Sequence, residues 1–308
     1  MLFISEAKQI GVDIERMIMY DDFRYSTDIK PTAMTEVNIP DNAAKERLDI
    51  HLAAHYNLSR ARAKELIEQG LVTINGKIVE KPSQPVNDSD VIAIIGEYDK
   101  YVSRGGYKLE KALARFGIDV RGFICADIGS STGGFTDCLL QAGAAKIYAI
   151  DNGTDQLADK LRNDNRVVSM ENTDIRSLFA LPEALDLITA DVSFISLCKI
   201  LENLAALSRE GTLIVCLLKP QFEAGFGKVN KSGIITDKRL HKKICFDTLC
   251  DFYTRGFEIL GFTFSPIKGG SGNIEYLIYA KRAENLAKIP REALKLMTDK
   301  TVGDAFAL

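Results

Sequence analysis

Apolar runs of strand length alternate with helical patterns between residues 104 and 282, and this alternation restricts the fold more than any other feature. Because runs such as "FICADIG" and "TLIVCLL" are almost continuously apolar, both faces of each strand should be buried. Helices would then cover both faces of a parallel sheet. The last two strand-like runs, "FEILGFTFSP" and "NIEYLIYAKR", have no helix between them and predict an antiparallel edge pair.

The overall composition excludes several classes of protein. The chain is 46% hydrophobic and 26% charged with a net charge of −3, so nucleic acid would have to bind through local basic patches. No apolar run approaches the roughly 20 residues of a membrane helix, and no secretory signal is recognisable. The six cysteines form no Cys-x-x-Cys pair, which indicates free thiols in a cytoplasmic protein and no metal site.

The segment "DIGSSTGGFTDCLL" (127–140) has the pattern of a strand, a glycine turn and a helix start. It matches neither the dinucleotide fingerprint nor the phosphate loop, because the glycine spacing differs and no lysine follows. Asp151 ends the second strand and Asp174 follows the third, where carboxylates suit a ribose and an exocyclic amine. Each carboxylate alone would more simply cap a strand end. Together they favour an adenosine without phosphates, such as S-adenosylmethionine.

The expected cofactor contacts are Asp127, Gly129, Ser130, Ser131, Thr132, Gly133, Gly134, Phe135, Thr136, Asp151, Asp174, Asp191 and Phe194. Phe194 could instead pack against a target base, or be a plain core aromatic.

Four charged residues should converge on the same rim of the sheet: Lys108, Asp191, Lys219 and Glu275. Lys219 is the most informative, because a charge directly after a buried strand carries a desolvation cost and needs a reason. The simpler alternative is a lysine whose ammonium reaches the surface.

Residues 46–96 have the pattern of a small separate module. Two short helical segments precede a hairpin with Asn75-Gly76 at its turn, the strongest short hairpin signal. The module resembles the S4-type RNA-binding domain, although its basic residues could equally form a solvated helix face. The expected RNA contacts are Arg47, Ser59, Arg60, Arg62, Lys64, Lys77 and Arg104.

The chain as a whole resembles the TlyA (haemolysin A) family, which joins an S4-type domain to an FtsJ-like methyltransferase domain. The resemblance rests on the motifs "SRGGYKL", "DIGSSTGGFTDCLL", "LRNDNRVV", "ADVSFISL", "LLKPQFEAG" and "SGNIEY". It implies a Rossmann-like class I methyltransferase fold: a seven-stranded, mostly parallel α/β sheet with an antiparallel edge, preceded by a small α+β domain.

The same resemblance implies an S-adenosylmethionine-dependent 2′-O-methyltransferase acting on cytidine in ribosomal RNA, without a metal. Its catalytic tetrad would be Lys108, Asp191, Lys219 and Glu275, with Lys219 as base or alkoxide stabiliser, although either lysine could serve. The alternatives are a membrane-active haemolysin and a non-catalytic RNA-binding assembly factor.

The resulting domain plan has five parts: an extension (1–45), the S4-type domain (46–96), a linker (97–103), the methyltransferase domain (104–282) and a tail (283–308).

Overall fold

The structure is a computed structural model of the chain. It describes residues 46–56, 58, 60–68, 70–87, 89–94, 100–225, 229–230, 232–286 and 291–307. The chain divides into two compact units between Lys100 and Tyr101, inside the expected linker. The expected extension (1–45) lies outside the described residues.

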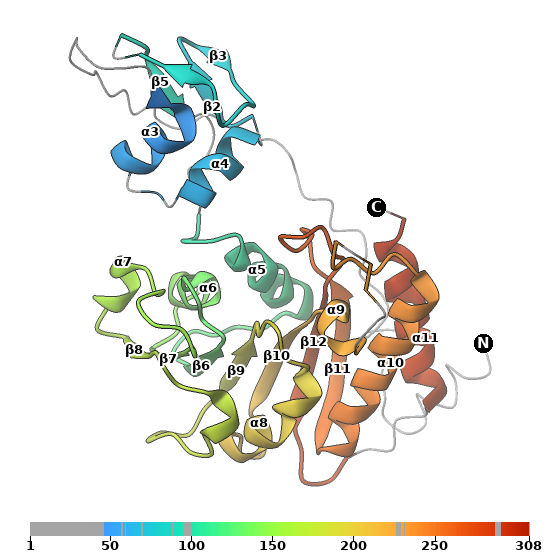
Figure 1. Ribbon diagram of the computed structural model, residues 1–308. Coiled ribbons are helices and arrows are strands. Elements are labelled where there is room, and N and C mark those ends of the chain that lie inside the picture. Colours follow the sequence, from blue (N-terminus) through green and yellow to red (C-terminus); the bar gives the residue numbers. More distant parts are fainter. Residues whose placement is uncertain are drawn as a thin grey trace. The chain divides into compact units, whose positions relative to one another are not determined.

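The larger unit is built on a seven-stranded sheet with the order β11-β12-β10-β9-β6-β7-β8 (Figure 1). Its strands are β6 (Ile124–Ile128), β7 (Lys146–Ile150), β8 (Val167–Met170), β9 (Leu187–Ala190), β10 (Leu213–Leu218), β11 (Phe257–Phe264) and β12 (Tyr276–Arg282). The first five are mutually parallel, whereas β12 runs antiparallel to both β10 and β11. The predicted fold class is confirmed, with one refinement: β12 lies between β10 and β11, and β11 forms the edge.

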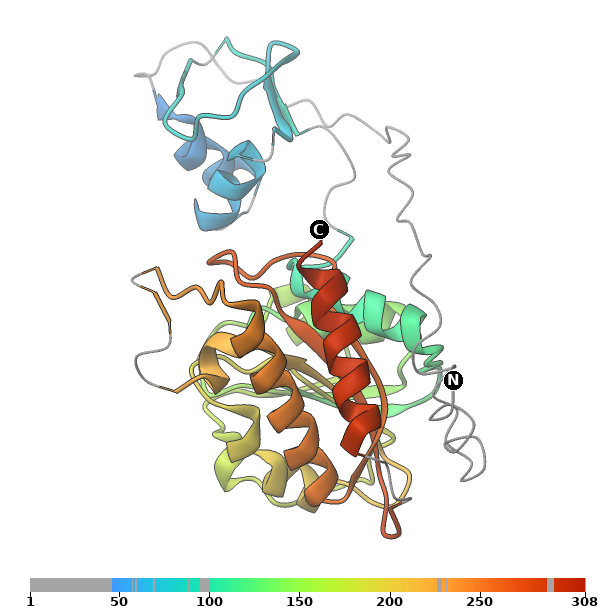
Figure 2. The same cartoon turned by 90° about the vertical axis from the view of Figure 1, so that its right-hand side faces the viewer.

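Helices cover both faces of this sheet, as the apolar strands predict. One face carries α5 (Gly105–Phe116), α6 (Gly134–Gln141) and α7 (Asp159–Arg162). The other carries α8 (Leu201–Leu207), α10 (Lys238–Thr254) and α11 (Arg291–Ala305), of which α10 and α11 lie side by side (Figure 2). Three one-turn elements complete the unit: η1 (Ile175–Ser177), η2 (Leu197–Lys199) and α9 (Pro220–Glu223).

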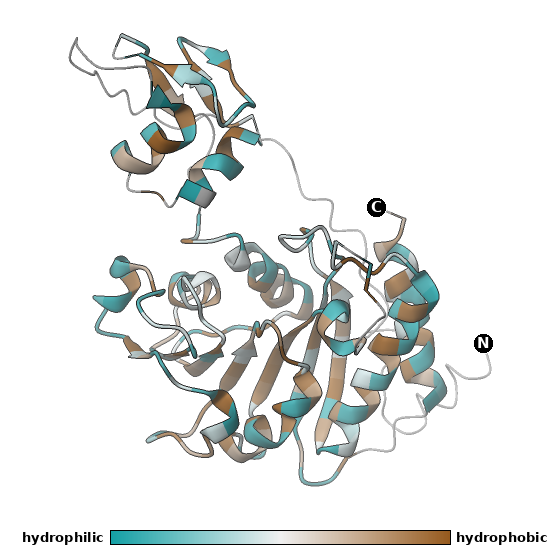
Figure 3. Ribbon diagram, viewed as in Figure 1, coloured by the Kyte–Doolittle hydropathy of each residue, from teal (hydrophilic) through white to brown (hydrophobic). Residues whose placement is uncertain are grey.

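The strands alternate between the two hydrophobic cores residue by residue. In β10, Ile214, Cys216 and Leu218 belong to the core beneath α8 and α10. Val215 and Leu217 belong to the core beneath α5 and α6. The hydropathy colouring shows the same arrangement, with apolar strands at the centre and polar helix surfaces outside (Figure 3). Polar side chains can therefore gather at the ends of the strands, where the chain leaves these cores.

The C-terminal tail contains a 15-residue helix, α11. Its Leu294, Met297 and Val302 are buried in the core beneath α10, and it contacts both α10 and β11. The tail thus helps to cover the edge strand of the sheet.

The smaller unit has two helices and short strands around its own core. The helices are α3 (Leu48–His55) and α4 (Arg60–Glu68); the strands are β1 (Glu46–Arg47), β2 (Val72–Ile74), β3 (Lys77–Ile78), β4 (Pro85–Val86) and β5 (Ile92–Ile94). Asn75 and Gly76 both have positive φ between β2 and β3, as the predicted hairpin turn requires. Among the described residues, no helix is both long and apolar enough to cross a membrane.

Candidate active site

The strand register brings distant residues to one edge of the sheet. Ile128 at the end of β6 pairs with Ile150 of β7 and Ala190 of β9, so the residues that follow these strands are neighbours. Because β12 is antiparallel, its first residue, Tyr276, pairs with Leu218, the last residue of β10. The residue before β12 therefore lies beside the residue after β10. The side of the sheet at which the parallel strands have their carboxyl ends, called the carboxyl edge below, therefore brings together Asp151, Asp191, Lys219 and Glu275.

Lys219 and Asp191 form an ion pair at this edge. Lys219 Nζ lies 2.6 Å from Asp191 Oδ1, and it donates a 2.8 Å hydrogen bond to Ser193 Oγ. The ammonium also lies 5.8 Å from the ring centre of Phe222, within the range of a cation–π interaction. Since Lys219 is buried, these contacts replace the water that its charge has lost. They aim the ammonium at the loop after β9 rather than at bulk solvent.

Lys108 and Glu275 form a second ion pair, and both of these side chains are buried. Lys108 Nζ donates a 2.7 Å hydrogen bond to Glu275 Oε2. A Cβ atom on Gly269 would lie 2.3 Å from Glu275 Oε1, so glycine at 269 leaves the space that this carboxylate occupies. The structure thus places all four tetrad residues in two lysine–carboxylate pairs.

The glycine turn between β6 and α6 is closely packed against the loop after β9. Gly129 has φ +77°, and a Cβ atom on it would lie 2.7 Å from the carbonyl oxygen of Asp191. The Ser131 amide donates a 2.8 Å hydrogen bond to Asp151 Oδ2, while Gly133 begins α6 at φ +95°. The turn therefore presents its backbone together with the small, exposed Ser131 and Thr132.

Asp151 and Asp174 differ in their surroundings. Asp151 accepts from the backbone amides of Ser131 and Gly153, which leaves part of its carboxylate open. Asp174 instead binds the guanidinium and the amide of Arg176, and the Arg176 side chain lowers the pKa of this carboxyl. Asp151 can thus accept a hydrogen bond from a ligand hydroxyl, whereas Asp174 is already paired with the Arg176 guanidinium.

Asp127 faces the interior of the unit. It accepts a 2.7 Å hydrogen bond from Thr136 Oγ1 and a 3.0 Å bond from Thr189 Oγ1. It is fully buried, and burial raises its pKa to about 6. Other members of the expected cofactor set are buried with it: Ser130, Gly133, Gly134, Phe135 and Thr136.

Phe194 is the opposite case, with 92% of its surface exposed. Its backbone has φ +62°, an uncommon conformation for an aromatic residue, and its ring centre lies 5.2 Å from that of Phe222. It is not a core aromatic. The ring stands next to the loop that carries Asp191 and Ser193.

Two residues of this region were absent from the predicted set. Ser193 accepts the hydrogen bond from Lys219. Glu223 accepts from the Ser196 hydroxyl and, at 2.7 Å, from the Leu197 amide, and burial raises its pKa. Both lie in the motifs "ADVSFISL" and "LLKPQFEAG", so their positions beside predicted residues were the available signal. Glu223 ties the loop after β9 to α9, which follows Lys219.

The predicted RNA contacts of the smaller unit are partly engaged with acidic residues. Arg47 and Arg60 both bind Asp49, whose pKa falls to about 2, mainly because of Arg47. Arg62 pairs with Glu65, Lys64 lies 3.6 Å from Glu68, and Lys77 is exposed. Arg104 belongs to the larger unit, where it donates to the Lys268 carbonyl. Ser59 lies outside the described residues.

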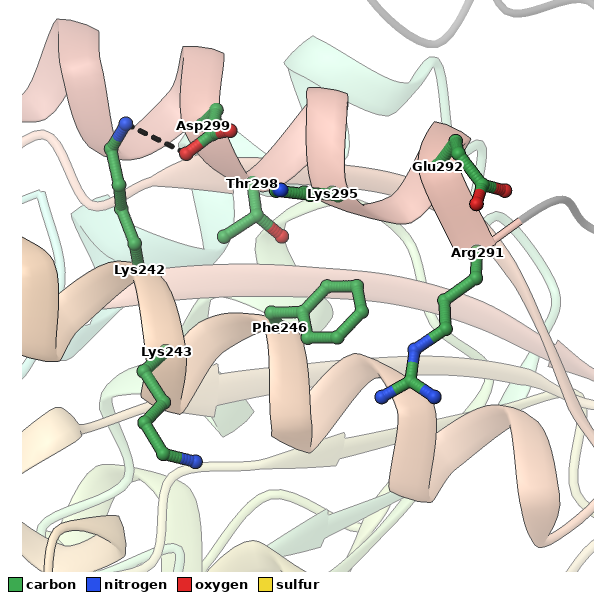
Figure 4. Close-up of a pocket in the computed structure, with 8 residues that line it drawn as sticks. All are labelled: Lys242, Lys243, Phe246, Arg291, Glu292, Lys295, Thr298 and Asp299. Atoms are coloured by element: carbon green, nitrogen blue, oxygen red, sulfur yellow. Dashed lines mark ion pairs between the residues drawn. The ribbon is translucent and has the colours of Figure 1, made fainter.

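A separate depression of about 430 Å³ lies between α10 and α11 (Figure 4). Phe246 forms part of its lining, and Arg291 lies over this ring. Lys242 pairs with Asp299 at 2.7 Å across the two helices. None of the predicted site residues lines this depression, so we place the candidate active site at the carboxyl edge instead.

Comparison with known proteins agrees with this geometry. Residues 101–282 match the FtsJ-like methyltransferase family, and residues 46–92 match the S4 domain. Hemolysin A of Brachyspira hyodysenteriae is 46% identical over 237 residues, covering 76% of this chain and 98% of that protein. The 16S/23S rRNA (cytidine-2′-O)-methyltransferase TlyA of Mycobacterium tuberculosis is 40% identical over 245 residues, covering 78% and 91%. The chain belongs to the TlyA family of FtsJ-like methyltransferases.

A solved structure supports the same assignment. The solved structure of a hemolysin-named protein from Streptococcus thermophilus superposes with a TM-score of 0.68 and is 39% identical. It covers 85% of this chain and 97% of its own. The predicted family and its two-domain composition are confirmed. Membership in a methyltransferase family implies S-adenosylmethionine as the methyl donor.

Proposed function

We propose that this TlyA-family chain transfers a methyl group from S-adenosylmethionine to the 2′-hydroxyl of a cytidine in ribosomal RNA. The observation that carries the proposal is the two lysine–carboxylate pairs, Lys219–Asp191 and the buried Lys108–Glu275, at the edge that also holds the glycine turn. The choice of cytidine in ribosomal RNA follows the name of the relative from Mycobacterium tuberculosis.

The residues at the edge fit S-adenosylmethionine. Gly129 lets the turn lie directly against the Asp191 carbonyl, which brings the backbone of the turn and the loop after β9 together, and the partly open Asp151 carboxylate can accept hydrogen bonds from both hydroxyls of a ribose. We assign the direct contacts to the backbone of residues 129–132 and to Asp151. Asp127 and Thr136 would support the turn from below, since both are buried and bonded to each other. When bound, the cofactor supplies an electrophilic methyl group on a sulfonium.

The chain must then activate a weakly acidic ribose hydroxyl and hold it in line with that methyl group. Lys219 is the preferred group, because its ammonium projects toward the loop that closes on the turn. It would either take the hydroxyl proton or stabilise the negative charge that develops on the oxygen. Asp191 and Ser193 would orient Lys219, while Lys108 and Glu275 would hold the ribose.

Phe194 would stack on the target base. An aromatic ring that is almost fully exposed beside the catalytic loop offers a face to a base that has left its RNA stack. Because Phe194 is not a core aromatic, its ring could contact either the target base or the methionine part of the cofactor. We favour the base because Phe194 packs against Phe222, directly beside Lys219.

The S4-type unit would hold RNA phosphates through Arg60, Lys64 and Lys77, while Arg47 shares Asp49 with Arg60. Because Asp49 and Glu68 compensate some of this charge, binding should be moderate and salt-dependent. An enzyme acting on ribosomal subunits would work in the cytoplasm.

The experiment uses purified protein, labelled S-adenosylmethionine and isolated ribosomal subunits, with the 2′-O-methyl positions mapped afterwards. Lys219→Ala should lower methyl transfer by roughly 10²- to 10⁴-fold, the range for loss of a general acid–base group. The matched control is Lys281→Ala, because Lys281 also pairs with a carboxylate at 2.9 Å but lies near the far end of β12. The absence of transfer by wild type, or equal rates for Lys219→Ala and wild type, would refute the proposal.

A further inference from the structure

We infer that Glu46, His51 and His55 of the S4-type unit form a binding site for a divalent transition-metal ion such as Zn²⁺. The inference is independent of the methyl-transfer proposal. It concerns a cluster that the sequence analysis did not predict, since no metal was expected there. His51 and His55 have the four-residue spacing of a helical metal-binding pair, but Glu46 joins them only in the structure.

The chain has only three histidines, and two of them belong to this cluster. His51 and His55 are four residues apart in α3, so they lie one above the other on the same helix face. Their ring centres are 4.2 Å apart. The third histidine, His241, is buried in the larger unit between the Tyr276 hydroxyl and the Ile235 carbonyl.

The donor atoms of the cluster already converge. One ligand atom from each of Glu46, His51 and His55 lies within 4.8 Å of the other two. His51 Nδ1 and Glu46 Oε2 are 3.3 Å apart. Two ligands about 2.0–2.1 Å from one tetrahedral zinc ion are roughly 3.3–3.4 Å apart, so this pair has the required separation. His55 is exposed and can complete the set by a side-chain rotation.

The donor set selects the class of metal. Two imidazole nitrogens and one carboxylate oxygen suit zinc, cobalt, nickel or copper, whereas magnesium and calcium prefer oxygen ligands only. The nearest other carboxylate in sequence, Asp49, does not belong to the set because its oxygens bind Arg47 and Arg60. A coordination position left by the three side chains would be taken by water.

A bound metal ion would stabilise the S4-type unit at β1 and α3. Glu46 is in β1 and both histidines are in α3, so the ion would tie the first strand to the first helix. The buried core of this unit is small: Leu48, Leu52, Ala63, Leu66, Ile67, Val72, Val86 and Ile92. Units of this size often gain stability from a metal or another cross-link.

The test titrates the metal-stripped full chain with Co²⁺, followed by absorption spectroscopy, and then with Zn²⁺ by calorimetry and thermal unfolding. Bound Co²⁺ should give visible d–d bands without the near-ultraviolet charge-transfer band of a thiolate ligand. Adding Zn²⁺ should displace the Co²⁺ and remove these bands. Zn²⁺ should also raise the unfolding temperature of the S4-type unit.

Two variants locate the site. His55→Ala is exposed and should fold normally, yet it should weaken Co²⁺ binding by at least the roughly 10- to 100-fold seen when metal sites lose a supporting group. Glu80→Gln removes an exposed carboxylate of the same unit and should bind Co²⁺ as wild type does. No Co²⁺ binding by wild type, a thiolate band, or unchanged binding by His55→Ala would each overturn the inference.

Discussion

The carboxylate of Glu275 accepts a 2.7 Å hydrogen bond from the ammonium of Lys108, although 167 residues separate them in the chain. Lys108 is only 8% exposed and Glu275 only 3%. Each charge therefore depends on the other for the stabilisation that water would otherwise supply. Lys219 and Asp191 form a similar pair at the same edge, so the site holds two positive and two negative groups.

Removing one member of the Lys108–Glu275 pair should destabilise the larger unit. Glu275→Gln leaves the buried ammonium without a counter-charge, which typically costs about 3–5 kcal/mol of unfolding free energy. The double variant Lys108→Met/Glu275→Gln should recover much of this loss, because both charges are gone. Urea unfolding followed by circular dichroism measures both values. Additive losses in the double variant would show that the two charges are not coupled.

Gly129→Ala should impair both stability and cofactor binding. The added methyl group would meet the Asp191 carbonyl at 2.7 Å, so the turn and the catalytic loop must separate. Calorimetry with S-adenosylmethionine should show strongly weakened binding. Gly122→Ala is the matched control, since Gly122 also has positive φ (+78°) but no atom of the described residues lies within 4 Å of the added Cβ. It should cost only the backbone strain of about 1–2 kcal/mol and leave cofactor affinity unchanged.

Asp127 should make the stability of the larger unit depend on pH. Its pKa is about 6 in the folded chain against 3.8 ordinarily, so between these values the folded chain holds a proton that the unfolded chain has lost. Its contribution to the unfolding free energy is therefore largest below pH 4, falls by roughly 3 kcal/mol as pH rises to 6, and then stays level. The asparagine side chain in Asp127→Asn does not titrate, so this variant lacks the pH-dependent contribution. The stability of wild type relative to Asp127→Asn should decline across that window, and a constant difference would contradict the assignment.

Phe194→Ala should separate catalysis on RNA from folding. Because the ring is 92% exposed, the unfolding free energy should change by less than about 0.5 kcal/mol. Loss of a base-stacking contact worth about 1–3 kcal/mol should lower kcat/KM for RNA by roughly 5- to 150-fold, with cofactor affinity unchanged. Phe179→Ala provides the control, since Phe179 is also exposed (60%) but belongs to no predicted site. Weaker cofactor binding by Phe194→Ala would instead place the ring against the methionine part.

The order of apolar runs was enough to predict the sheet, because continuous burial of strands such as β10 leaves few other arrangements. The tetrad could be predicted because a charge directly after a buried strand is costly and because the motifs resemble those of the TlyA family. The position of β12 could not be predicted from alternation, since a strand without a preceding helix can pair at either side of its neighbour. Only the register between Leu218 and Tyr276 shows why Glu275 lies near Lys219.

Three site details depended on side-chain direction, which residue identity does not reveal. Asp127 lies one residue before the end of β6, so strand alternation turns it toward Thr136 and the core rather than toward the edge. Asp174 pairs locally with Arg176, an interaction that its position after β8 did not indicate. The convergence of Glu46 on the two histidines likewise required the turn from β1 into α3.

The internal position of β12 also has a consequence for the order in which the enzyme is made. A chain translated only through β11 already contains the glycine turn, Lys108, Asp191 and Lys219. It still lacks Glu275 and the strand that pairs β10 with β11. The proposed catalytic arrangement is therefore completed by the last strand of the sheet to leave the ribosome. If Glu275 belongs to the catalytic set as proposed, we expect the chain to act on ribosomal RNA only after β12 has been made and has paired with β10.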